Sequence, residues 1–141
     1  IIDALQVYQS KMIGADCILL IASALSYKLF EELYSLAVSL NLDVLAEVHN
    51  IDELDFVKSL GIKLLGINNR NLKTFEVDIN TSVQLSDSIT DEETVIVSES
   101  GIRTPEDVSK LNKSGIFTFL IGEHLIKSTN TSEEIGELIN A

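Results

Sequence analysis

Four groups of polar residues or glycines interrupt the apolar runs of this sequence, and the first contains a carboxylate. Glu47 lies within the apolar stretch 44–48, where an ionised side chain is unfavourable unless it is paired. Burial raises the pKa of a carboxyl group towards the range of a useful acid or base. A structural glutamate held in an ion pair is the alternative. We favour acid–base function because Glu47 lies near the end of a predicted strand.

The second group follows the apolar run 64–67 and consists of Asn68, Asn69, Arg70 and Asn71. Amides and a guanidinium at a strand end can form many directed hydrogen bonds to a polar or anionic ligand. A solvated, asparagine-rich turn after a strand is the alternative. This segment alone does not decide between the two.

The other two groups place a glycine after a strand. Gly101 follows Ser100, and Gly122 precedes Glu123. Glycine lets the backbone approach a ligand closely, and the neighbouring N–H groups can then donate to a phosphate. In (β/α)8 barrels the loops after the last two strands form such a site. Because a G-x-S-x-G pattern is missing, we predict a phosphate site here and not a nucleophile elbow.

The histidines and the single cysteine suggest no further chemistry. His49 is expected to border the site without catalysing, and His124 to pack or face solvent. No spacing suits a metal, so we predict none. Cys17 lies in an apolar run and is expected to be a core thiol. With no disulfide framework, a cytoplasmic location is expected.

Hydrophobic periodicity predicts helices and short strands in alternation. Asp3 with Gln6 fits a capping box at the start of a helix. Leu5, Tyr8 and Met12 fall at helical spacing in the residues that follow Asp3. Further N-caps are predicted at Ser26, Asn50, Asn80 and Thr104. Helices are expected between residues 3 and 14 and at 27–40, 51–60, 81–88, 105–111, 123–126 and 132–139. Strands are expected at 16–22, 43–48, 63–68, 94–98 and 117–121, with the first buried on both faces.

This alternation predicts an α/β fold of parallel βαβ units with right-handed crossovers. A doubly wound sheet and part of a (β/α)8 barrel both fit. In a barrel the polar strand ends converge on one face, whereas in an open sheet they spread along an edge. Five strands are too few for a closed barrel, and the sequence starts without methionine. We therefore expect residues 1–141 to be the C-terminal part of a single TIM-barrel domain.

Charge and hydropathy disfavour two classes of binding partner. Ten basic and twenty-two acidic residues give a net charge of −12, which disfavours nucleic acid and anionic membranes. No apolar run reaches the ~18 residues of a membrane span, and no signal peptide is evident. We expect neither a nucleic-acid nor a membrane partner.

The sequence resembles the indole-3-glycerol phosphate synthases, the (β/α)8-barrel lyases of tryptophan biosynthesis, over essentially its whole length. The matching segments are 43–49, 66–75, 97–102 and 119–123. Segment 66–75 is highly specific, whereas the others would be weak alone. The resemblance implies conversion of 1-(2-carboxyphenylamino)-1-deoxyribulose 5-phosphate to indole-3-glycerol phosphate, with loss of carbon dioxide and water. It implies no metal and no cofactor.

The resemblance also implies roles for single residues. Glu47 takes the place of the acid–base carboxylate and Asn68 that of the substrate-orienting amide. Arg70 takes the position near the substrate's carboxylate, where a bidentate contact suits a guanidinium. Glu123 could bind phosphate only through its amide, since like charges repel. The expected residues are Glu47, Asn68 and Ser100 as catalytic, Arg70 and Glu99 as substrate-binding, and Gly101, Gly122 and Glu123 as phosphate-binding.

One departure from the family bears on activity. Its first three strands supply two essential lysines and another glutamate, and neither Lys63 nor Lys73 matches either lysine. We expect this chain alone to be inactive or nearly so, because each well-placed acid or base contributes ~10²–10⁴-fold. Open sheet edges at 16–22 and 117–121 should favour self-association or an N-terminal half-barrel partner.

Two other functions remain open. One is a half-barrel phosphate-binding or assembly module that needs a partner chain. The other is a different phosphosugar barrel, such as phosphoribosylanthranilate isomerase or the tryptophan synthase α subunit. Segment 66–75 argues against the second, because those sites are not built on its pattern.

Overall fold

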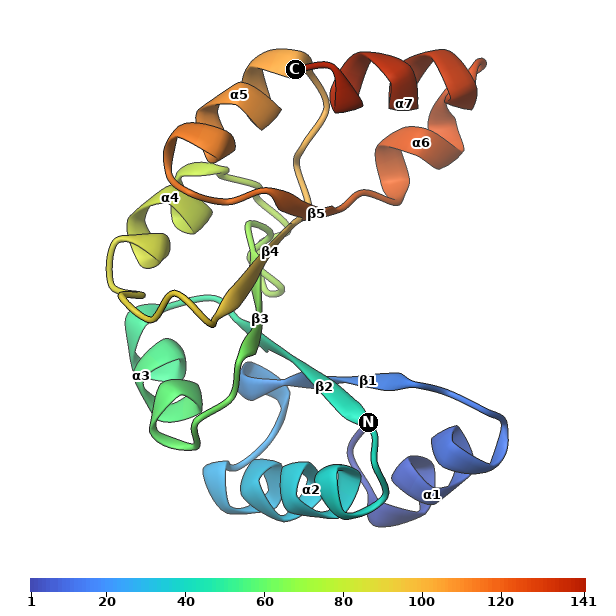
Figure 1. The fold of residues 1–141 in the computed structure, drawn as a ribbon, viewed down its shortest axis with the longest axis vertical. Coiled ribbons are helices and arrows are strands. Elements are labelled where there is room, and N and C mark those ends of the chain that lie inside the picture. The colour runs from blue at the N-terminus through green and yellow to red at the C-terminus, as the bar shows by residue number, and fades with distance from the viewer. The chain divides into compact units, whose positions relative to one another are not determined.

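The computed structural model describes residues 1–141 as five strands that alternate with helices (Figure 1). The strands follow one another in the sheet in sequence order, β1-β2-β3-β4-β5. Their bounds are β1 Cys17–Ile21, β2 Asp43–Val48, β3 Leu64–Asn68, β4 Val95–Glu99 and β5 Thr118–Leu120. The helices are α1 Ala4–Met12, α2 Tyr27–Ser39, α3 Ile51–Ser59, α4 Asn80–Ser86, α5 Pro105–Lys113, α6 Glu123–Lys127 and α7 Thr131–Ile139, with the 3-10 turn η1 at Ala22–Ala24. Every predicted element is present.

Residues 1–66 form one compact unit and residues 67–141 a second, and each is described by itself. In the first unit β1 pairs in parallel with β2, so that Ile21 lies opposite Glu47. Helix α2 packs against both strands and also contacts α1 (Figure 1). Its buried residues are Phe30, Leu33 and Ala37, all on one face of the helix.

The prediction that the first strand is buried on both faces is wrong. Ile18 and Leu20 are buried, whereas Cys17 and Leu19 are exposed. Successive side chains of a strand point to opposite faces, and only the face towards α2 is covered within this unit. Cys17 is therefore an exposed thiol and not the core thiol that its apolar neighbours suggested.

Helix α1 shows the same discrepancy. Its apolar residues Leu5, Tyr8 and Met12 are exposed, Met12 by 85%, and only Val7 is buried. The helical period was recognised correctly, but spacing does not reveal whether another element covers that face. The predicted capping box is also wrong, because Gln6 Oε1 accepts from the backbone N–H of Ile2.

Most predicted helix starts are confirmed. The side chains of Asp3, Ser26, Asn50 and Thr104 each accept a hydrogen bond from a backbone N–H in the first turn. Thr104 and Asp107 form a complete capping box ahead of α5. The cap predicted at Asn80 is wrong, because α4 starts at that residue without a side-chain cap.

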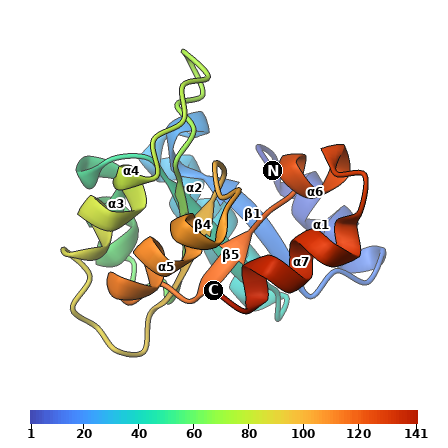
Figure 2. The same cartoon turned by 90° about the horizontal axis from the view of Figure 1, so that it is seen from above.

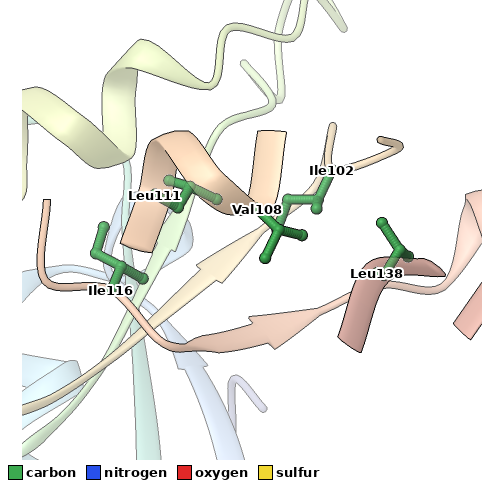
Figure 3. Packing of buried hydrophobic residues seen from close by; sticks show 5 residues of the cluster. All are labelled: Ile102, Val108, Leu111, Ile116 and Leu138. Atoms are coloured by element: carbon green, nitrogen blue, oxygen red, sulfur yellow. The ribbon is translucent and has the colours of Figure 1, made fainter. Parts of the chain in front are cut away.

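The second unit has its own apolar core. Strand β4 pairs in parallel with β5, and α7 packs against both α5 and α6 (Figure 2). Figure 3 shows five buried side chains contributed by α5, by α7 and by the segments that flank α5. They are Ile102, Val108, Leu111, Ile116 and Leu138. This core fixes α5 and α7 beside the segments that follow β4 and β5.

No helix of the structure combines the length and the apolar character that crossing a bilayer requires.

Candidate functional site

A cluster of three ionisable side chains lies where β2 leads into α3. His49 Nε2 lies 3.3 Å from Glu47 Oε1, and His49 Nδ1 lies 3.3 Å from Glu53 Oε2. Glu47 is 4% exposed, and the side chains of His49 and Glu53 are only slightly more accessible. The imidazole is therefore held between two carboxylates.

The start of α3 explains why Glu53 faces the histidine. Asn50 caps this helix by accepting from the Glu53 N–H at 2.9 Å. The Glu53 carboxylate then turns back, accepting from the Asn50 side-chain amide at 2.6 Å and from the His49 N–H at 2.8 Å. Both Glu53 oxygens are thus engaged, which fixes the carboxylate against the ring.

The pKa of His49 is raised above its ordinary value. The main cause is the Glu47 carboxylate, whose Oε1 lies 3.3 Å from Nε2, and the charge of Glu53 acts in the same direction. Burial opposes the shift, since it disfavours the charged form, but does not cancel it. His49 therefore keeps its proton to a higher pH than an ordinary histidine does.

In the second unit a buried network surrounds Asn69. Its Nδ2 donates to Ser98 Oγ at 3.0 Å and to the Ser100 carbonyl at 2.9 Å. Its Oδ1 accepts from Ser82 N at 3.0 Å and from Ser82 Oγ at 2.8 Å. One amide therefore joins the end of β3, the end of β4 and helix α4. Because both donors and both acceptor positions of this amide are already in use, Asn69 has a structural role and does not bind ligand.

Replacing Asn69 by alanine is expected to lower the free energy of unfolding by ~2 kcal/mol, because buried polar groups left without partners cost ~1–3 kcal/mol. Chemical denaturation with circular dichroism would measure the loss. Asn140→Ala is the control. Asn140 is exposed and its Nδ2 donates to the Gly136 carbonyl at 2.6 Å, so that change should remove about 0.5 kcal/mol or less. Equal losses for the two variants would contradict the network.

The loop after β4 adopts an unusual backbone. Ser100 has a φ of 67° and Gly101 a φ of 82°, so two successive residues are in the left-handed region. A Cβ atom at Gly101 would lie 2.3 Å from the Val77 Cγ1 atom. Glycine is needed here because the backbone packs directly on the side chain of Val77.

A cavity of about 540 Å³ lies in the second unit, where β4 and β5 end. Arg70 donates from Nη2 to Glu123 Oε2 at 2.5 Å across it, and Lys127 Nζ donates to Glu123 Oε1 at 2.5 Å. The cavity thus combines glycine loops with two cations that share one carboxylate. Its lining residues are Arg70, Ser100, Gly101, Ile102, Arg103, Leu120, Ile121, Gly122, Glu123, His124 and Lys127.

The Glu123 carboxylate stays charged in this arrangement. Its pKa is lowered by the hydrogen bond and the charge of Lys127, with a further contribution from Arg70. It therefore pairs with the Arg70 guanidinium, for which the sequence predicted an anionic ligand. Gly122 lies at the start of α6 with open space around it.

The structure brings most predicted site residues together within the second unit. Ser100, Gly101, Gly122, Glu123 and Arg70 all line the cavity. Glu99 and Asn68 are buried, at the ends of β4 and β3. Glu47 belongs to the first unit. His124 pairs with Glu134 at 2.9 Å, and no group of three or more His, Cys, Asp or Glu side chains is arranged to hold a metal ion.

Sequence reasoning missed the roles of Asn69, Ser82, Ser98 and Glu53. The available signal was a polar side chain inside a stretch that otherwise reads as buried, as at Ser98 in β4. The partners of Asn69 lie 13 to 31 residues away, so no local pattern reveals them. Glu53, by contrast, contacts Asn50 and His49 three and four residues away, a spacing that the sequence does display.

Comparison with solved structures defines the class of fold. 3-Hexulose-6-phosphate synthase superposes with a TM-score of 0.77 over 99% of this chain and 69% of that one, at 15% sequence identity. Thiamine phosphate pyrophosphorylase from Pyrococcus furiosus has a TM-score of 0.71 at 16% identity, covering 95% of this chain and 62% of that one. The chain is therefore a partial (β/α)8 barrel, an α/β fold with five of the strand–helix units.

Sequence comparison then identifies the family. The sequence model of the indole-3-glycerol phosphate synthases matches residues 1–138. The synthase of Lachnospira eligens is 50% identical, over 97% of this chain and 53% of its own length. That of Chromobacterium violaceum is 46% identical, over 100% of this chain and 53% of its own length. The chain belongs to the indole-3-glycerol phosphate synthase family and spans about half the length of these curated relatives.

Proposed function

We propose that this chain is the part of an indole-3-glycerol phosphate synthase that binds the substrate phosphate and supplies the acid–base carboxylate. The supporting observation is the family match over residues 1–138, which includes every residue that we place in the site. The reaction closes the pyrrole ring of 1-(2-carboxyphenylamino)-1-deoxyribulose 5-phosphate and releases carbon dioxide and water. The ligand is accordingly a small phosphorylated molecule.

The cavity of the second unit supports the phosphate assignment. Gly101 and Gly122 line it, and backbone N–H groups at glycine loops of this kind suit a phosphate. Once the Glu123 carboxylate turns away, Lys127 supplies positive charge beside the phosphate, and Arg70 is free to contact the substrate's carboxylate. Asn68 orients the substrate, while Glu99 and Ser100 complete the polar wall of the site.

Glu47 carries the proton transfers of ring closure and dehydration. Its carboxylate is almost fully buried beside His49, in surroundings that tune the affinity of a carboxylate for protons. No lysine of this chain matches the two that the resemblance implies. We therefore expect the chain alone to bind ligand with little or no turnover.

A fusion enzyme tests this proposal. The part of the Lachnospira eligens synthase outside the matched region would be joined ahead of Ile1, and product would be measured by indole fluorescence. We expect the fusion to turn over the substrate, and the 141-residue chain to bind it in calorimetry without measurable turnover. A folded fusion that neither binds nor converts the substrate would contradict the proposal.

The second candidate is a half-barrel phosphate-binding or assembly module. The pairing of Arg70 and Lys127 with Glu123 beside two glycine loops would serve such a module equally well. Binding of inorganic phosphate together with an inactive fusion would favour it. Self-association through β1 and β5, which end the strand order, and a cytoplasmic location remain predictions.

A further inference from the structure

His49 is an ionisable group beside the proposed base, and the mechanism above gives it no task. It lies directly after β2, only two residues beyond Glu47, and its side chain is 13% exposed. Both ring nitrogens lie 3.3 Å from a carboxylate oxygen, one of Glu47 and one of Glu53. A histidine that merely filled space would not need to face two acids.

We propose that His49 is a positioning residue for Glu47: held by Glu53, it keeps a donor nitrogen against the Glu47 carboxylate and controls whether that carboxylate carries its charge. This inference rests on the proposed function, since it assumes that Glu47 is the base. It links the cap of α3, through Glu53 and His49, to the Glu47 carboxylate.

Glu53 determines the orientation of the imidazole. Its carboxylate is anchored by Asn50 and by the His49 backbone N–H before it reaches the ring. With Nδ1 as the donor to Glu53, Nε2 is directed towards Glu47. A carboxylate that orients a histidine in this way also strengthens the affinity of the ring for a proton.

The effect of His49 and Glu53 on the Glu47 carboxylate is electrostatic. Glu47 and Glu53 are the charged groups that act on the ring, and both favour its protonated form. An imidazolium within 4 Å of Glu47 in turn stabilises the ionised carboxylate. The base is therefore ready at a lower pH than it would be beside a neutral neighbour.

The test measures titration in the 141-residue chain, which makes it independent of turnover. Glutamate labelled with ¹³C in the carboxyl group would be titrated by NMR in the native chain and in His49→Gln. We expect the Glu47 midpoint to rise by about one pH unit in the variant, since a nearby opposite charge shifts a carboxyl pKa by about 1–3 units. His124→Gln, whose ring contacts Glu134, is the matched control and should leave that midpoint unchanged.

Glu53→Gln provides a second test that leaves the imidazole in place. We expect the His49 midpoint, followed by ¹⁵N NMR, to fall and the Glu47 midpoint to rise by less than in His49→Gln. In the fusion enzyme the acidic limb of the pH–rate profile should move with the Glu47 midpoint. An unchanged Glu47 midpoint in a folded His49→Gln chain would overturn the inference, whether or not the fusion is active.

Discussion

Replacing Glu47 by glutamine in the fusion enzyme is expected to reduce turnover by ~10²–10⁴-fold, the usual contribution of one general acid or base. Glutamine has nearly the same shape as glutamate but cannot exchange a proton at neutral pH. Because Glu47 is 4% exposed and lies in β2, a larger change would disturb the strand as well. Steady-state kinetics by indole fluorescence would measure the loss.

A control on the same strand separates chemistry from folding. Asp43 begins β2 and is exposed, so Asp43→Asn changes the same functional group away from the site. It should keep turnover within about twofold and leave stability within ~0.5 kcal/mol, as surface substitutions usually do. If Glu47→Gln retained near-normal turnover while its thermal stability dropped, Glu47 would be a structural ion-pair partner, the alternative that its sequence context left open.

The fold was predictable because its signals are local. Ser26 and Asn50 precede apolar runs of helical period, and their side chains cap the helices that follow. Strands end where polar residues or glycine begin, as at Asn68. Each of these signals lies within a few residues of the feature that it specifies, so neighbouring residues suffice to recognise it.

Burial was less predictable because it depends on distant partners. Met12 and Cys17 lie in apolar surroundings along the chain, yet both are exposed. A regular spacing of apolar residues shows that one face of a helix or strand can be buried. Which element covers that face depends on residues elsewhere in the chain. Leu5 on α1 illustrates the same limit, being 61% exposed at a regular helical position.

The site was predictable in composition but not in pairing. The sequence identified Arg70 and Glu123 as separate members, and only the structure shows that their side chains meet across 53 residues. It likewise assigned His49 to the border of the site, although Glu53 fixes its ring through the geometry of a helix cap. The Arg70–Glu123 pairing is set by tertiary structure, which leaves no periodic mark in the sequence. The His49–Glu53 pairing is local, but it depends on the side-chain geometry of the cap at Asn50.

Replacing Gly101 by alanine is expected to lower the free energy of unfolding by about 3 kcal/mol. A residue with a Cβ atom in the left-handed region costs ~1–2 kcal/mol, and overpacking adds ~1–3 kcal/mol. Both apply, because Gly101 has a φ of 82° and its added Cβ would lie 2.3 Å from Val77 Cγ1. Since Gly101 also lines the cavity, phosphate affinity should fall with stability. Urea denaturation and calorimetry would measure the two effects.

Gly115 and Val77 divide this loss into its two causes. Gly115 has a φ of 78° with nothing within 4 Å of an added Cβ, so Gly115→Ala should show only the backbone cost of ~1–2 kcal/mol. Adding Val77→Ala to Gly101→Ala removes Cγ1 and leaves Val77 Cβ at 3.8 Å, an ordinary contact. The double variant should therefore regain most of the overpacking loss and resemble Gly115→Ala. If Gly101→Ala alone already matched Gly115→Ala, the loop after β4 would not pack on Val77, and the shape of the phosphate loop would have another origin.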